Sequence, residues 1–118
     1  MKVFTFTDVI EPAGDKPLRV LARISVVRTE DGGRKGPFTH HYRPNHNFGG
    51  PTDRTFYIGQ VEIPEGMWVH PGETRDLEIT FLNVRGLSAL LQVGRKWRIQ
   101  EGGRHVANAE VLELLNEA

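Results

Sequence analysis

The sequence predicts an all-β domain of antiparallel strands, in the form of a barrel or a sandwich. Apolar and polar residues alternate in several short runs, which is the period of a half-buried strand. Thirteen Gly and seven Pro residues gather between these runs, where turns are needed. A chain of 118 residues has the size of one domain and can bury a core without disulfides. We therefore expect residues 1–118 to form a single domain.

The first clear strand pattern covers residues 18–26. One face would carry Leu18, Val20, Ala22, Ile24 and Val26, and the opposite face Arg19, Arg23 and Ser25. A turn is expected at residues 30–33, where two acidic residues precede two glycines. Residues 1–8 also alternate, and we expect them to join the same domain.

Three further runs alternate in the same way, at residues 57–63, 76–81 and 96–100. Turn residues flank them at 64–66, 70–72 and 101–103. In the last run Trp97 and Ile99 share the apolar face, so we expect Trp97 in the core. The polar face of that run would hold Lys96, Arg98 and Gln100.

Two segments do not read as strands. Residues 107–118 consist of good helix formers, and their apolar residues follow helical spacing, which predicts a C-terminal helix. Residues 87–91 are expected to form either a helical turn or a buried loop.

Composition and motifs exclude several classes of function. The chain has no Cys and a formal net charge of zero, which argues against thiol chemistry and against a bulk polycation. No apolar run approaches the roughly 20 residues that span a bilayer, and no signal pattern opens the chain, so we expect a cytoplasmic protein. Neither a phosphate-binding loop nor a hydrolase motif is present. We therefore expect neither an enzyme nor a nucleotide or cofactor site.

Histidines and basic residues leave two kinds of site open. His40, His41 and His46 could hold a metal if His70 or His105 supplied a third ligand, but they equally fit the rim of a strand and its loop. Residues 85–105 carry a charge of +4. This local excess favours a patch that contacts the RNA backbone.

A series of turn motifs resembles the C-terminal, third domain of elongation factor Tu. The motifs are Glu30-Asp31-Gly32-Gly33-Arg34, Pro37-Phe38, Tyr42-Arg43-Pro44, Pro64-Glu65-Gly66, Pro71-Gly72 and Glu101-Gly102-Gly103-Arg104. Their order and spacing match over residues 18–115. The resemblance implies a six-stranded antiparallel β-barrel in which residues 101–104 form the hairpin between the last two strands. It therefore implies a strand, in place of the predicted helix, after residue 104.

The resemblance also implies a function, because this domain contacts the T-stem backbone of aminoacyl-tRNA in the family. The GTPase domain and the second barrel have no counterpart in the sequence, so we expect a stand-alone, non-enzymatic module for translation-related RNA (tRNA) binding. The positions that the resemblance assigns to RNA are Arg34, Lys35, Thr55, Glu101 and Gly102, to which charge and position add Arg104. The expected affinity is weak and salt-sensitive.

Departures from the family pattern favour a second function, in which the domain mimics elongation factor Tu toward a translation-related protein or a toxin. Asn45 stands after Tyr42-Arg43-Pro44 where the family has glutamine, so a surface near Arg43 and Asn45 is freed from its usual contact. Leu87 and Leu90, if exposed, would add an apolar patch for a protein partner. The alternative is that these leucines close one end of the barrel.

Overall fold

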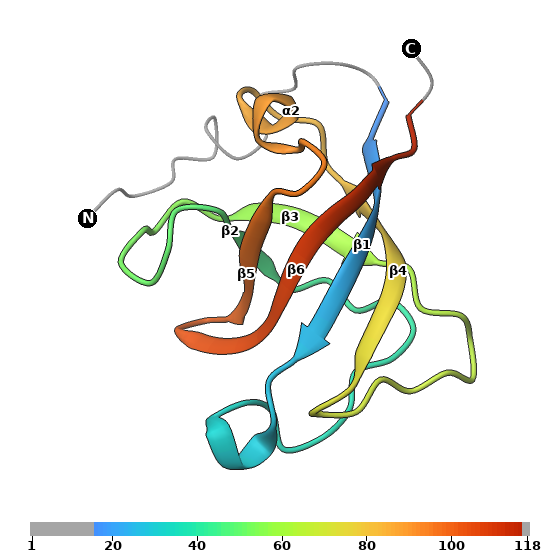
Figure 1. Cartoon of the computed structure of the whole chain (residues 1–118), viewed down its shortest axis with the longest axis vertical. Coiled ribbons are helices and arrows are strands. Elements are labelled where there is room, and N and C mark those ends of the chain that lie inside the picture. The colour runs from blue at the N-terminus through green and yellow to red at the C-terminus, as the bar shows by residue number, and fades with distance from the viewer. Residues whose placement is uncertain (1–15, 117–118) are drawn as a thin grey trace.

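The computed structural model of the protein describes residues 16–116 and consists mainly of strands (Figure 1). The strands are β1 (Leu18–Val26), β2 (Asn45–Asn47), β3 (Tyr57–Val61), β4 (Thr74–Phe81), β5 (Lys96–Glu101) and β6 (Arg104–Leu114). Two short helices join them, the 3-10 helix η1 (Thr29–Asp31) and α2 (Leu87–Leu90). The pattern predicted at residues 1–8 lies outside the described residues.

The six strands close into a barrel in the order β1-β4-β3-β2-β5-β6. Every neighbouring pair is antiparallel, and β6 returns to pair with β1. The antiparallel all-β fold is thus confirmed, with the six-stranded barrel that the resemblance implies. Within residues 16–116, each of the six strands therefore has a paired neighbour on both sides.

The alternating patterns fill the barrel largely as expected. Val20, Ala22, Ile24 and Val26 of β1 all point into the core, and Trp97 is 4% exposed. Gln100 keeps the predicted alternation, because its Oε1 accepts a hydrogen bond of 3.2 Å from Nε of Arg98 on the same face, but it is buried against the end of β2. Its side-chain Oε1 accepts a hydrogen bond of 2.8 Å from Asn47 Nδ2.

The helix predicted for residues 107–118 is wrong, since β6 extends to Leu114. Val106, Ala107, Ala109 and Val111 are buried between the ladders that β6 makes with β5 and β1. These two ladders and the core contacts outweigh the modest helix propensity of the segment. After β6, the Asn116 side chain donates a hydrogen bond of 2.8 Å to the Pro17 carbonyl and accepts one from the Arg19 backbone N–H.

Helix α2 closes one end of the barrel, above the strands in Figure 1. Leu87 and Leu91 are 0% and 3% exposed, and Leu90 packs against the core. The alternative that these leucines close the barrel is therefore the correct one. No helix within residues 16–116 is long and apolar enough to cross a membrane.

A buried imidazole ties three strands together inside the barrel. The Nε2–H of His46 in β2 donates to the Gly59 carbonyl of β3 at 2.9 Å, and its Nδ1 accepts from the indole N–H of Trp97 in β5 at 3.0 Å. A Cβ on Gly59 would lie 2.8 Å from the Phe81 ring and 3.0 Å from His46 Nε2, so only glycine allows this approach. Complete burial lowers the pKa of His46 to about 4.

This pKa makes stability depend on pH. Below pH 6.5 the unfolded chain binds a proton at His46 that the folded chain does not bind until about pH 4, so stability falls as the pH drops between these values. The full loss is about 3 kcal/mol for a shift of this size. Urea denaturation at pH 7.5, 5.5 and 4.5 measures it, with His46→Gln as the variant that removes the titrating group.

The stability difference between wild type and His46→Gln should shrink as the pH falls through this window. Glu73 and Glu78 do not obscure the result. The His70 backbone N–H and the Arg19 side chain, respectively, lower the pKa of these carboxylates by hydrogen bonding, so their contributions are lost only below about pH 4.5. A difference that stays constant with pH would contradict the burial of a neutral imidazole.

Candidate nucleic-acid interface

Two turns that are far apart in the sequence meet at the end of the barrel opposite α2. One follows β1 and includes η1, and the other joins β5 to β6 (Figure 1). Arg34 Nε forms an ion pair of 2.8 Å with Glu101, and the Arg104 guanidinium donates a hydrogen bond of 3.4 Å to the Gly33 carbonyl. The structure therefore brings Arg34, Glu101 and Arg104 together, as the assignment to one surface requires.

Arg34 is held firmly inside this contact. Its guanidinium lies 5.6 Å from the centroid of the Phe38 ring and 5.3 Å from that of Tyr42, and the two rings stack on each other. Tyr42 Oη donates a hydrogen bond of 2.5 Å to Glu101. Burial, with help from the neighbouring Glu101, raises the pKa of Tyr42, so the phenol stays protonated. Arg34 and Glu101 thus act mainly to join the two turns.

The exposed groups of the same surface are Lys35, Gly102 and Arg104. Lys35 makes no ion pair or side-chain hydrogen bond within residues 16–116. Gly102 has a φ of 58°, a left-handed conformation that keeps the turn tight and free of a side chain. An incoming phosphate would therefore meet one unpaired ammonium, one guanidinium and an open stretch of backbone.

Thr55 does not belong to this surface. It lies in the loop between β2 and β3, where its backbone N–H donates to Asp53 Oδ1 at 2.8 Å. It lines a hollow with Phe48, Tyr57 and Arg95. Arg95 directly precedes β5, whereas Glu101 is the last residue of that strand. Of the residues assigned to RNA, the structure brings together all but Thr55.

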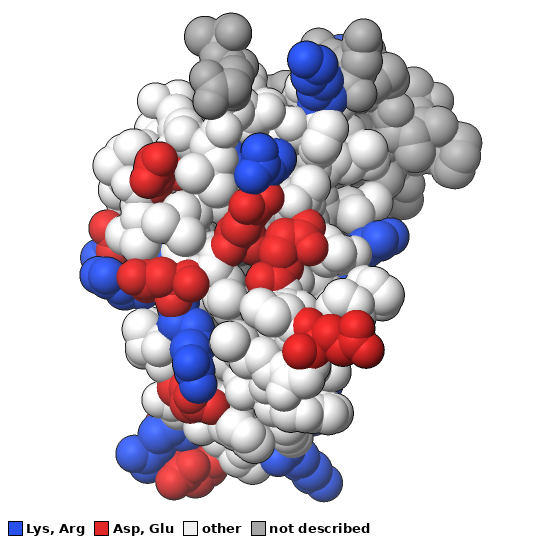
Figure 2. Space-filling model, turned by 90° about the vertical axis from the view of Figure 1, so that its right-hand side faces the viewer, with Lys and Arg blue, Asp and Glu red and all other residues white. Residues whose placement is uncertain are grey.

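Charges are distributed unequally around the barrel. On β1 and β4, Arg19 pairs with Glu78 at 2.7 Å and Arg23 with Asp76 at 3.0 Å, and basic and acidic side chains are interspersed on the side seen in Figure 2. On β5 and just before it, Arg95, Lys96 and Arg98 form no ion pair with a carboxylate of residues 16–116. The basic segment predicted from the sequence therefore keeps an unneutralised face.

The residues predicted to bind a protein are scattered. Arg43 is exposed and donates a hydrogen bond of 3.1 Å to Gln60, and Asn45 is half-buried in β2. Leu87 is buried and Leu90 largely so, which rules out the exposed leucine patch. Sequence reasoning missed two exposed apolar residues beside Arg43, namely Ile58 (39% exposed) and Leu82 (46%). The alternation would have placed Ile58 outward, on the face of Gln60.

The histidines do not form a metal site in the described part of the chain. Both ring nitrogens of His46 make hydrogen bonds inside the core, so neither can ligate a metal. The rings of His40 and His41 lie 3.7 Å apart, but no group of three or more potential ligands occurs within residues 16–116.

No protein-family model matches the sequence. The six-stranded antiparallel barrel, with the turn after Glu101 joining its last two strands, is compatible with the third domain of elongation factor Tu.

Stability measurements distinguish Arg34 and Lys35, the two neighbouring basic residues of the turn that follows β1. Arg34→Ala should lower the free energy of unfolding by about 1 to 2 kcal/mol, because Glu101 loses its charged partner and two aromatic rings lose a packed side chain. Lys35→Ala should change it by less than about 0.5 kcal/mol. Urea denaturation provides both values. Equal effects would contradict a joining role for Arg34.

Proposed function

We propose that the protein is a non-enzymatic, translation-related module that binds the phosphate backbone of a tRNA-like stem. The observation that carries this proposal is the contact between the two turns, which holds Lys35, Gly102 and Arg104 on one exposed surface. The turn motifs that resemble elongation factor Tu assign Lys35 and Gly102 to the T stem, and charge and position add Arg104.

The residues of this surface have different tasks in the proposal. Arg34, Glu101 and Tyr42 fix the two turns relative to each other. Lys35 and Arg104 contact phosphates, and the exposed backbone at Gly102 allows the RNA to approach closely. Arg34 neutralises the charge of Glu101, and the Tyr42 hydroxyl donates a hydrogen bond to the same carboxylate. Glu101 therefore repels an incoming phosphate only weakly. The surface is small, so we expect micromolar or weaker affinity.

Titration of labelled aminoacyl-tRNA with the purified protein at several salt concentrations tests the function. Wild type should bind with a steep salt dependence. Lys35→Ala combined with Arg104→Ala should weaken binding about tenfold or more at low salt and reduce the slope of log K against log salt by roughly 1.4 to 1.8, the value for two lost phosphate contacts.

The matched control is Arg19→Ala combined with Arg75→Ala. It removes the same charge from the face where both arginines are already paired with carboxylates, and it should leave RNA binding within about twofold of wild type. Equal losses in the two double variants would show that binding follows net charge and not this surface. Absence of any tRNA binding at high protein concentration would overturn the function and favour a protein-binding module.

A further inference from the structure

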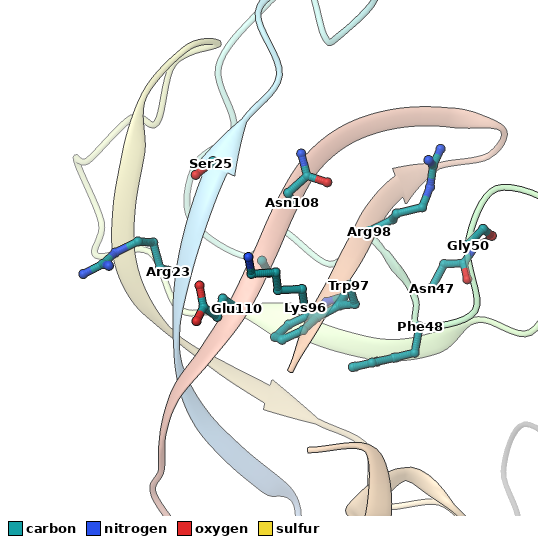
Figure 3. A pocket seen from close by; sticks show the side chains of 11 residues that line it. Arg23, Ser25, Asn47, Phe48, Gly50, Lys96, Trp97, Arg98, Asn108 and Glu110 are labelled. Atoms are coloured by element: carbon teal, nitrogen blue, oxygen red, sulfur yellow. Dashed lines mark hydrogen bonds between the residues drawn. The ribbon is translucent and has the colours of Figure 1, made fainter. Parts of the chain in front are cut away.

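A groove runs along the outer surface of β5 and β6, beside the loop that follows β2 (Figure 3). It has a volume of about 600 Å³. Lys96, Arg98, Asn108 and Glu110 form its floor, and Asn47 and Gly50 form one wall. Lys96 and Arg98 belong to the basic segment 85–105 noted in the sequence, whereas Asn47, Gly50, Asn108 and Glu110 were assigned to no site.

The wall of the groove is held in place by buried contacts. Asn47 Nδ2 donates to the carbonyls of Gly50 and Asp53 at 2.7 and 3.1 Å and to Gln100 Oε1 at 2.8 Å. The Phe48 ring stacks on Trp97, with a centroid distance of 4.9 Å. The loop is therefore fixed by buried contacts, and the groove is preformed.

Two cations of the floor have no carboxylate partner. Lys96 makes no ion pair or side-chain hydrogen bond within residues 16–116. Within residues 16–116, Arg98 makes one side-chain hydrogen bond, from Nε to Gln100 Oε1 at 3.2 Å, so both of its Nη groups are available. Arg23 also lines the groove, but its guanidinium is bound by Asp76.

Asn108 adds a neutral donor to these cations. It pairs with Arg98 across the β5–β6 ladder, and the two side chains point in the same direction in Figure 3. Its Oδ1 accepts a hydrogen bond of 2.9 Å from His105 Nε2, which leaves the Nδ2 donors free. Glu110, opposite Lys96, is the one carboxylate among the residues that line the groove.

We propose that this groove binds phosphate groups of the RNA strand, with Lys96, Arg98 and Asn108 as donors. The inference rests on the proposed function and adds a second set of phosphate contacts. Lys96 and Arg98 leave the same face of β5 about 7 Å apart. The Arg98 guanidinium can grip a phosphate with two N–H groups, whereas Lys96 acts as a point charge.

The tRNA titration also tests the groove, with Lys96→Ala combined with Arg98→Ala. This variant should weaken binding about tenfold at low salt and reduce the salt slope by roughly 1.4 to 1.8. Glu110→Gln removes the opposing charge and should tighten binding on the order of twofold. The double variant Arg19→Ala with Arg75→Ala again serves as the control of equal charge, and thermal melting checks that each variant is folded.

A second probe separates this inference from the proposed function. Pyrophosphate added to isotope-labelled protein should shift the backbone amide NMR signals of Lys96, Arg98 and Asn108, and the shifts should disappear in the Lys96→Ala, Arg98→Ala variant.

If tRNA binds but the groove variant behaves like the control, the groove inference is wrong and the proposed function stands. If tRNA does not bind but pyrophosphate shifts these signals, the groove is a phosphate site and the proposed function is wrong. If neither probe binds, both are overturned.

Discussion

The double pairing of β6 is the constraint on which the rest of the molecule depends. One edge of β6 bonds to β5 and the other to β1, which closes the ring. Because of this pairing, the Val27 N–H donates a hydrogen bond of 2.9 Å to the Val106 carbonyl. The chain that leaves β1 therefore starts beside the hairpin between β5 and β6. The contact between Arg34 and Glu101 follows from this arrangement. Ring closure thus determines both the core and the surface at the hairpin end.

Within the ring, a small set of polar contacts fixes the position of β2. This strand has three residues, too few to hold its place by apolar contacts alone, and two of them, His46 and Asn47, are fully buried. Each finds partners on neighbouring segments, so neither leaves a buried polar group unsatisfied. Because these hydrogen bonds are directional, they fix the register of β2 against β3 and β5. Asn47 also lines the groove, so the same hydrogen bonds fix the position of the groove wall.

The sequence predicts much of the barrel and less of the surface. Alternation identified β1, β4 and β5 because each has one buried and one solvated face, and it placed Trp97 correctly. It placed Gln100 on the face of Arg98 but could not predict its burial, which depends on Asn47 of β2. Local propensity failed for β6, whose strand state depends on partners distant in the chain. The turns were visible as motifs. Their contact, and the fixed role of Arg34 within it, depend on ring closure, which no local pattern encodes.

The junction of Pro17 and Asn116 has a consequence for how such a domain can be combined with others. The Asn116 side chain bridges the start of β1 and the chain just after β6, so the polypeptide enters and leaves the ring at almost the same point. A host chain could therefore carry the barrel as an insertion within a surface loop, with little separation between the two points of attachment. The same proximity suits circular permutation, because a short linker across this junction would leave every ladder of the barrel intact.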